Sequence, residues 1–142
     1  MTSLFNPGLG KLHHPKAILC LCHDSNMLLI RRLLLEHFGY VVLPTTSVDE
    51  ARSMAALQCP DMLLMDNGDP GMDYARLAEQ VKQVCPDVIT VVLSAYYRLS
   101  STGAAGSIDR FVAKDDGPDA LIAQIKELLE ANESQHTHGF EP

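Results

Sequence analysis

Three reactive side chains stand directly after short apolar runs of the sequence: the carboxylate of Asp66, the hydroxyl of Ser94 and the ammonium group of Lys114. If these runs are parallel strands, their carboxyl ends meet at one edge of the sheet, where the sites of such folds gather. Any one of these side chains alone would be interpreted as a solvated strand end. The three together, each after a different run, predict a functional site at that edge.

A second group of reactive side chains, Cys22, His23 and Asp24, lies at the end of the first apolar run. A thiol beside an imidazole suggests a nucleophile and its base, but adjacent residues of a strand point to opposite faces, which disfavours that pairing. A phosphatase of the aspartate-nucleophile class would need a second aspartate two residues after Asp66, and Gly68 stands there instead. The sequence therefore does not predict an enzyme.

The four cysteines are Cys20, Cys22, Cys59 and Cys85. No pair has C-x-x-C spacing, and residues 1–15 lack the features of a secretion signal. We therefore expect reduced, buried thiols rather than a disulfide framework. A soft-metal or redox sensor using Cys20, Cys22 and His23 is an alternative, in which Cys22 and His23 would have to reach one ion.

Five apolar runs alternate with segments of helical periodicity. The expected strands are Ala17–Cys22, Tyr40–Leu43, Met62–Met65, Val88–Leu93 and Phe111–Ala113. The expected helices cover residues 25–38, 47–58, 74–84, a weak segment at 99–105, and 117–131. The tripeptide Cys-Pro-Asp occurs at 59–61 and again at 85–87, each time between a helix and a strand, because proline ends the helical pattern.

The helix expected at 25–38 is rich in apolar residues. Its predicted buried face consists of Met27, Ile30, Leu34 and Phe38. Ser25 is the expected N-terminal cap, and Gly39 ends the helix. The adjacent pair Arg31 and Arg32 is interpreted as part of a solvated helix face.

The alternation of strands and helices predicts an α/β fold. Right-handed crossovers make it a doubly wound, five-stranded parallel sheet flanked by five helices, with flavodoxin-like topology. Residues 16–131 form the expected domain. The segments 1–15 and 132–142 lack a periodic pattern and are expected to be flexible tails.

Composition and charge indicate a globular domain and argue against a nucleic-acid-binding or membrane-spanning protein. The 142 residues suffice for one domain, with 46% apolar and 20% charged residues as in ordinary globular proteins. The formal net charge of −7 and the scattered basic residues argue against direct nucleic-acid binding. No apolar run approaches the ~20 residues of a membrane span. We expect a cytoplasmic protein that binds neither nucleic acid nor membrane.

The strand ends resemble those of the receiver domain of bacterial response regulators. The resemblance rests on Met65-Asp66, on 70–73 (Pro-Gly-Met-Asp), on Leu93-Ser94-Ala95 and on 111–114 (Phe-Val-Ala-Lys). It covers residues 16–131, and the Asp, Ser and Lys at the ends of strands three, four and five are specific as a set. Tyr74 stands where glycine is usual in the family.

The resemblance implies a role for each of these residues. Asp66 is the phosphoacceptor, which attacks the phosphoryl group of a histidine kinase phosphohistidine. Lys114 pairs with a phosphoryl oxygen, Ser94 donates a hydrogen bond to the phosphoryl group, and Phe111 is the aromatic switch that swings inward.

The resemblance also implies a Mg²⁺ cofactor in an acidic pocket. Its ligands would be the carboxylates of Asp66 and Asp24 and the backbone carbonyl of Gly68. The pocket is atypical, because Cys22 and His23 occupy the positions where receivers carry two adjacent acids. A thiol is a poor ligand for hard Mg²⁺, so Mg²⁺ affinity is expected to be weakened.

Two functions follow from the resemblance. The first is a stand-alone response-regulator receiver of a two-component phosphorelay, phosphorylated on Asp66 by a sensor histidine kinase or phosphotransfer protein and signalling to an output protein by contact. The alternative is a phosphorylation-independent pseudo-receiver that acts as a protein-interaction module, which Cys22 and His23 favour. The region 98–129 is where the family makes contacts, which leaves room for a homodimer.

Overall fold

The computed structural model describes residues 14–66, 73–95 and 106–140, with side chains up to residue 133. The strands are β1 (Ala17–Leu21), β2 (Val41–Thr45), β3 (Met62–Asp66), β4 (Ile89–Ser94) and β5 (Arg110–Ala113). The helices are α1 (Ser25–His37), α2 (Val48–Gln58), α3 (Tyr74–Val84), the short 3₁₀ helix Lys114–Asp116 and α5 (Gly117–Phe140). The ends of the five strands fall within two residues of the sequence-based boundaries.

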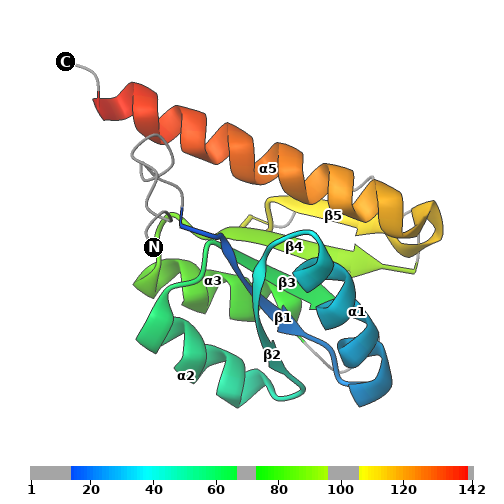
Figure 1. The fold of residues 1–142 in the computed structure, drawn as a ribbon. Helices are drawn as coiled ribbons and strands as arrows, with labels where there is room; N and C mark the ends of the chain where they lie inside the picture. The colour runs from blue at the N-terminus through cyan, green and yellow to red at the C-terminus, as the bar shows by residue number, and fades with distance from the viewer. Residues whose placement is uncertain (1–13, 67–72, 96–105, 141–142) are drawn as a thin grey trace, which may run out of the picture.

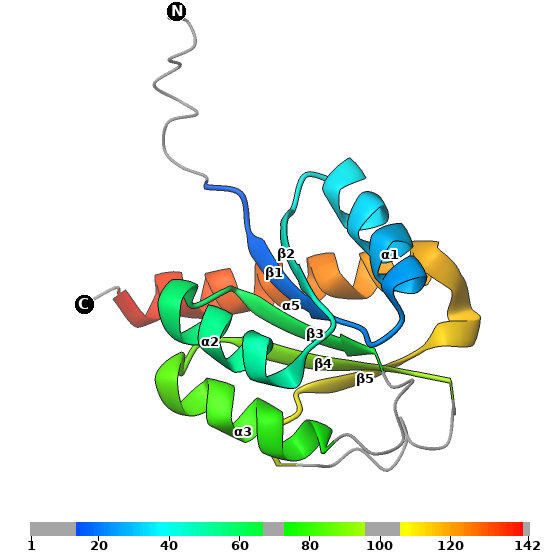
Figure 2. The ribbon, with the colours of Figure 1, turned by 90° about the horizontal axis from the view of Figure 1, so that it is seen from below.

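The five strands form one parallel sheet in the order β2-β1-β3-β4-β5. Helices α1 and α5 cover one face, and α2 and α3 cover the other (Figures 1 and 2). The predicted doubly wound topology is therefore confirmed. Five helices were expected and the described residues hold four longer than one turn, because the weak segment 99–105 lies outside them.

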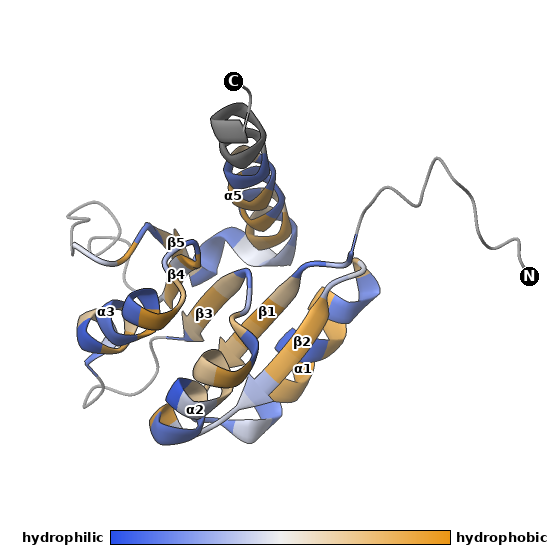
Figure 3. Ribbon diagram, turned by 90° about the vertical axis from the view of Figure 1, so that its left-hand side faces the viewer, coloured by the Kyte–Doolittle hydropathy of each residue, from blue (hydrophilic) through white to orange (hydrophobic). Residues whose placement is uncertain are grey.

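The core consists of two apolar layers, one on each face of the sheet. Alternate residues of β1 point to opposite layers: Ile18 and Cys20 pack under α1 and α5, whereas Leu19 and Leu21 pack under α2 and α3. Strands that are buried on both faces appear as continuous apolar runs, which is why β3 and β4 are predictable from the sequence. Figure 3 shows these apolar strands and the mixed polar and apolar surfaces of α3 and α5.

Helix α1 buries a different face from the one predicted. Its buried residues are Leu28, Arg31 and Leu35, whereas Ile30 is 58% exposed and Phe38 is 46% exposed. The helix is apolar on most sides, so two stripes fit the helical period equally well. The interpretation of Arg31 as a solvated residue is therefore wrong, while Arg32 is exposed and pairs with Glu36.

The N-terminal cap of α1 is Asp24 rather than Ser25. Its Oδ1 accepts hydrogen bonds from the backbone N–H groups of Asn26 at 2.9 Å and Met27 at 3.2 Å. A carboxylate at this position also interacts favourably with the positive end of the helix dipole. Asp24 thus has a structural role that the sequence-based assignment to Mg²⁺ did not include.

Helix α5 continues to Phe140, beyond residue 131 where the sequence pattern ended. It therefore covers most of the segment expected to be a tail, and Figure 1 shows it running past the edge of the sheet. None of the described helices, α5 included, combines the length and the apolar character of a membrane span.

Cys59 and Cys85 form a disulfide bond, contrary to the expectation of four reduced thiols. Cys20 and Cys22 are free and buried, as expected. Spacing along the chain did not reveal the bond, because the two cysteines are far apart in sequence. The fold brings the ends of α2 and α3 side by side, and each of these two cysteines follows one of those helices.

Candidate functional site

The register of the sheet brings the three predicted strand-end residues to one edge. Asp66 is the last residue of β3 and pairs with Leu93, so Ser94 lies one residue further along β4. Ser94 in turn pairs with Ala113, and Lys114 follows directly. We call this the carboxyl edge of the sheet.

Lys114 forms an ion pair with Asp66 across the end of β4. Its Nζ lies 2.5 Å from Oδ1 of Asp66, which is only 5% exposed, whereas the lysine side chain is 28% exposed. Because the carboxylate is buried, its charge needs partners within the protein. The lysine meets this need at one of the two oxygens.

Arg31 supplies the partner for the second oxygen. Its Nη2 lies 2.9 Å from Oδ2 of Asp66, and the arginine is itself 8% exposed. Its Nε is buried without a hydrogen-bond partner among the described residues. Sequence reasoning missed this residue because charged helix residues are usually exposed. The available clue was its spacing from Leu28 and Leu35, which places it in an apolar stripe.

The Cys22 thiol also contacts the carboxylate. Its Sγ lies 3.6 Å from Oδ2 of Asp66 and 3.5 Å from the backbone oxygen of Asp24, and the thiol hydrogen can be donated to either acceptor. Burial raises the pKa of the Cys22 thiol, and burial raises the pKa of Cys20 to about 12. Both thiols are therefore protonated at neutral pH. A protonated thiol is not an active nucleophile. The soft-metal alternative lacks support on geometric grounds, because no three His, Cys, Asp or Glu side chains of the described residues are placed to hold a metal ion.

Tyr74 contacts the main chain of Asp66. Its hydroxyl donates a hydrogen bond to the backbone carbonyl of Asp66 at 3.3 Å. The tyrosine is the first residue of α3, so this bond links the start of that helix to the end of β3. Tyr74 occupies the position where glycine is usual in the resembled family, and the structure gives its side chain a defined contact.

The remaining predicted residues take different places. Ser94 is fully buried at the end of β4. Phe111 is partly buried and packs against the core layer under α2 and α3. His23 is exposed, and Gly68 lies outside the described residues. The switch roles of Ser94 and Phe111 stay predictions.

The described residues are a poor fit to Mg²⁺, which takes hard oxygen ligands. Where receivers carry acids, the pocket offers the protonated Cys22 thiol, and the Arg31 guanidinium lies against the same carboxylate oxygen. Asp24 uses one oxygen to cap α1. Within the described ranges, no group of three His, Cys, Asp or Glu side chains is placed to hold a metal ion. The predicted ligand set of Asp24, Asp66 and Gly68 stays a prediction.

A cavity of about 200 Å³ borders both cations of the site. It lies between α1 and the start of α5, and its lining includes Arg31 and Lys114. The other lining residues are Ile30, Leu34, Leu93, Gly117, Pro118 and Leu121. The site is therefore bordered by an apolar surface on the side of α1.

No protein-family model matches the sequence. One curated relative, the hydrogenase transcriptional regulatory protein HoxA of Cupriavidus necator, is 30% identical over 106 residues. These residues make up 72% of this chain but 21% of HoxA. The chain therefore spans about a fifth of the length of the curated relative that it matches.

Two solved structures of receiver domains show the same fold at low sequence identity. A CheY-like response regulator receiver domain protein from Methanospirillum hungatei has a TM-score of 0.76 and 23% identity, covering 86% of this chain and 99% of its own. The signal receiver domain of an HD domain-containing protein from Pseudomonas fluorescens has a TM-score of 0.77 and 19% identity, covering 91% and 97%.

A third solved structure is the response regulator TrrA of Thermotoga maritima, in complex with Mg²⁺ and BeF. Its TM-score is 0.70 at 23% identity, covering 80% of this chain and 98% of its own. These likenesses agree with the strand order of the sheet, and they confirm the resemblance at the level of the fold. The chain has the receiver fold of CheY-like response regulators.

Proposed function

We propose that this protein is a receiver module of two-component signalling, in which Asp66 accepts a phosphoryl group and the result is passed on by protein contact. The observation that carries the proposal is the pairing of both Asp66 oxygens with cations, Lys114 at one and Arg31 at the other. The receiver fold supports a signalling role rather than an enzymatic one.

The charges at the carboxyl edge suit a phosphorylated aspartate. The carboxylate and its two cations carry a net charge of one positive unit. An acyl phosphate carries close to two negative units in place of one, by analogy with other protein phosphates, which brings this sum to about zero. Arg31 and Lys114 therefore supply the neutralisation for which receivers ordinarily use a divalent cation. We expect phosphorylation with little dependence on Mg²⁺.

In the proposed step, an Asp66 oxygen attacks the phosphorus of a phosphohistidine. The P–N bond breaks, its electron pair stays on the imidazole, and a mixed anhydride forms on Asp66. Such a transfer depends mainly on positioning and charge stabilisation, which a guanidinium and an ammonium group provide. The Cys22 thiol is neutral at pH 7, since burial raises its pKa, and it adds no repulsion to the incoming phosphoryl group.

The proposed donor is a histidine kinase or phosphotransfer protein that docks on α1. The helix presents Ile30 and Leu33, each more than half exposed, and Ile30 also lines the cavity beside Arg31 and Lys114. An apolar contact next to two cations would position a phosphohistidine near Asp66. An output partner, a homodimer and a cytoplasmic location are further parts of the proposal.

The test is phosphorylation by a small phosphodonor. The full chain is incubated with acetyl phosphate or phosphoramidate, with Mg²⁺ or with EDTA, and analysed by intact mass. We expect one phosphoryl group under both conditions. The Asp66→Asn variant should remain unlabelled, and label on that variant would overturn the assignment of the acceptor.

Arg31→Met provides the matched arm of the experiment. It removes the guanidinium but keeps an apolar stem, so labelling in EDTA should drop by roughly tenfold or more. Arg32→Met is the control, because Arg32 is exposed and pairs only with Glu36 among the described residues. Equal labelling of the two variants would show that Arg31 has no part in the transfer.

A second candidate is the phosphorylation-independent pseudo-receiver. The burial of Asp66, which is 5% exposed, favours this candidate, because a buried carboxylate has little access to a phosphodonor. In that case no phosphodonor would label the chain under any condition, while partner binding would persist in Asp66→Asn.

A further inference from the structure

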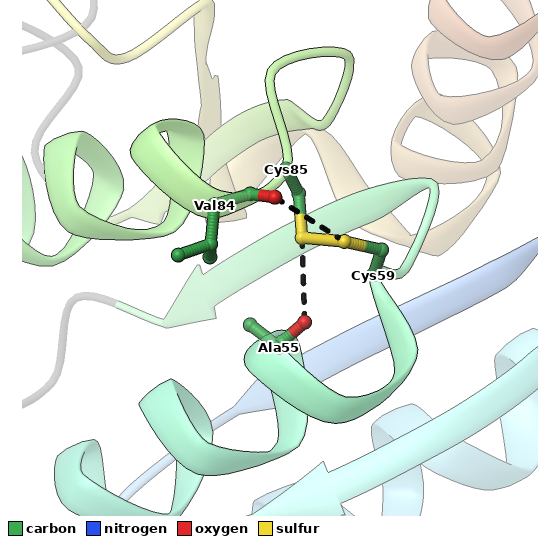
Figure 4. The surroundings of a disulfide bond; sticks show 4 residues. All are labelled: Ala55, Cys59, Val84 and Cys85. Atoms are coloured by element: carbon green, nitrogen blue, oxygen red, sulfur yellow. Dashed lines mark hydrogen bonds between the residues drawn. A yellow bond between two sulfur atoms is a disulfide. The ribbon is translucent and has the colours of Figure 1, made fainter.

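The two Cys-Pro-Asp tripeptides meet at the end of the sheet opposite the acceptor site. Cys59 follows α2 and Cys85 follows α3, and the disulfide joins these two helix ends (Figure 4). Each tripeptide leads toward a strand, so the bond lies where β3 and β4 begin. We call this the amino edge of the sheet. Asp66 is at the far end of β3.

The two cysteines differ in exposure. Cys59 is exposed, whereas Cys85 is 3% exposed and belongs to the core layer under α2 and α3. The rate of thiol–disulfide exchange depends on which sulfur is attacked and on access to it. A thiol from solution therefore reaches Cys59 more readily than Cys85.

A cavity of about 310 Å³ opens beside the bond. Its lining includes both cysteines, the prolines that follow them, and Lys16. The cavity gives a small thiol room to approach the bond. Its charged lining residues are Lys16, Asp61, Asp87 and Glu133, and Lys16 pairs with Glu133 at 3.9 Å, so the approach depends on access rather than on attraction of a thiolate.

Each sulfur atom has a hydrogen-bond acceptor in place for its reduced form. The backbone carbonyl of Ala55 lies 3.3 Å from Sγ of Cys85, and that of Val84 lies 3.6 Å from Sγ of Cys59 (Figure 4). A disulfide sulfur carries no hydrogen, so these acceptors serve the thiols that reduction creates. After reduction each S–H group therefore has a carbonyl oxygen nearby to accept its hydrogen, that of Ala55 for buried Cys85.

The fold does not depend on the bond for its core. Apolar side chains fill both layers of the sheet, and a chain of this size buries enough surface to fold without cross-links. A single bond in such a domain differs from the dense frameworks of small secreted proteins. The bond therefore adds stability to a fold that its apolar core can already form.

We infer that Cys59 and Cys85 form a reversible thiol–disulfide site, with Cys59 as the sulfur attacked by a small thiol and Cys85 as the partner that leaves. The thiolate of the small thiol bonds to Sγ of Cys59, and the bond to Cys85 breaks. Its electron pair passes to the Cys85 sulfur, which takes a proton from water. A second small thiolate then attacks the sulfur of the bound small thiol, and the bond to Cys59 breaks. The electron pair passes to the Cys59 sulfur, which takes a proton from water, and the two small molecules leave as a disulfide.

The disulfide closes a loop of the chain that contains Asp66. The two cysteines are 26 positions apart, and the loop between them contains all of β3 and α3, including Asp66 and Tyr74. Reduction frees the two ends of this loop from each other, while the hydrogen bond from Tyr74 to Asp66 holds its middle. This inference is independent of the proposed phosphorylation, because it involves neither Arg31 nor Lys114.

Trapping on the unmodified chain tests which sulfur is attacked. The oxidised full chain is treated briefly with reduced glutathione, quenched with acid and mapped by peptide mass. We expect the mixed disulfide on Cys59, with Cys20 and Cys22 unmodified. Glutathione on Cys85 would overturn the inference, and so would a bond that persists at glutathione concentrations high enough to reduce an ordinary exposed disulfide.

Two single variants give the matched comparison. With oxidised glutathione, folded Cys85→Ser should acquire one glutathione on Cys59 roughly tenfold or more faster than Cys59→Ser acquires one on Cys85. The serine of the Cys85→Ser variant keeps a hydroxyl beside the Ala55 carbonyl, which helps this variant to fold. Equal rates would refute the asymmetry. Phosphoryl labelling of Asp66 should survive in both variants, which separates a failure here from a failure of the proposed function.

Discussion

The two edges of the sheet are held together by different kinds of interaction. At the amino edge a covalent bond joins the ends of α2 and α3, and at the carboxyl edge two cations hold one buried carboxylate. Strand β3 runs between the two, because it begins directly after the tripeptide at 59–61 and ends at Asp66. One strand thus links a bond that is sensitive to thiols with a cluster that is sensitive to charge.

Removing the covalent bond should have the largest effect on stability. Reduction, or the Cys59→Ser substitution, should lower the free energy of unfolding by about 3–4 kcal/mol, because the bond joins residues 26 positions apart and restricts the unfolded chain. Urea unfolding with and without reductant measures the difference. In Cys59→Ser the reductant should change nothing, and a reductant effect that persists there would place the sensitivity elsewhere.

Breaking an ion pair at the carboxyl edge should have the next largest effect on stability. Arg31→Met should lower the free energy of unfolding by about 2–3 kcal/mol, because it leaves Oδ2 of a buried carboxylate without its cation while Lys114 keeps Oδ1. Arg32→Met, at the exposed neighbour, should cost less than about 0.5 kcal/mol. In Arg31→Met combined with Asp66→Asn the losses should be less than additive, and full additivity would contradict a direct pair.

Alkaline pH should weaken the core layer under α1 and α5, to which Cys20 belongs. Burial raises the pKa of Cys20 from 9.0 to about 12, so between these values the folded chain keeps a proton that the unfolded chain loses. This contribution to stability is complete well below pH 9.0 and is lost as pH rises towards 12, with about 1.4 kcal/mol lost by pH 10. Urea unfolding of the oxidised chain at several pH values measures the slope. Cys20→Ala should show a shallower slope, and an unchanged slope would assign it to other groups.

The smallest of these effects should come from removing the N-terminal cap of α1, which lies next to the carboxyl edge. Asp24→Ala removes the acceptor of two backbone N–H groups and should lower the free energy of unfolding by about 1 kcal/mol. Asp24→Asn keeps an acceptor and should retain most of that stability in thermal or urea unfolding. If Asp24→Ala changed phosphoryl labelling in Mg²⁺ but left stability unaltered, its role would be that of a metal ligand rather than a cap.

The strands and their convergence at one edge could be predicted because their patterns are local. Runs such as Met62–Met65 are apolar on both faces, and parallel strands bring their carboxyl ends together. Asp66, Ser94 and Lys114 therefore converge without any knowledge of the helices. Their proposed chemistry came from the resemblance to receivers, not from the pattern.

Two contacts could not be predicted in the same way, that of Arg31 with Asp66 and that of Cys85 with Cys59. The position of Arg31 depends on how α1 rotates about its axis, and a helix that is apolar on most sides leaves that rotation open. The bond between Cys59 and Cys85 depends on two helix ends that only the folded sheet brings together. The repeated Cys-Pro-Asp tripeptide was the local clue to it.

The contact between Arg31 and Asp66 also constrains how this site can change in evolution. Replacing Cys22 by aspartate while Arg31 stays would place a second carboxylate beside the guanidinium, which favours another ion pair over a metal site. Losing Arg31 first would leave Asp66 with one cation fewer. Neither single step adds a free oxygen ligand beside Asp66, so we expect the two positions to be epistatic, with stronger Mg²⁺ binding only when both change.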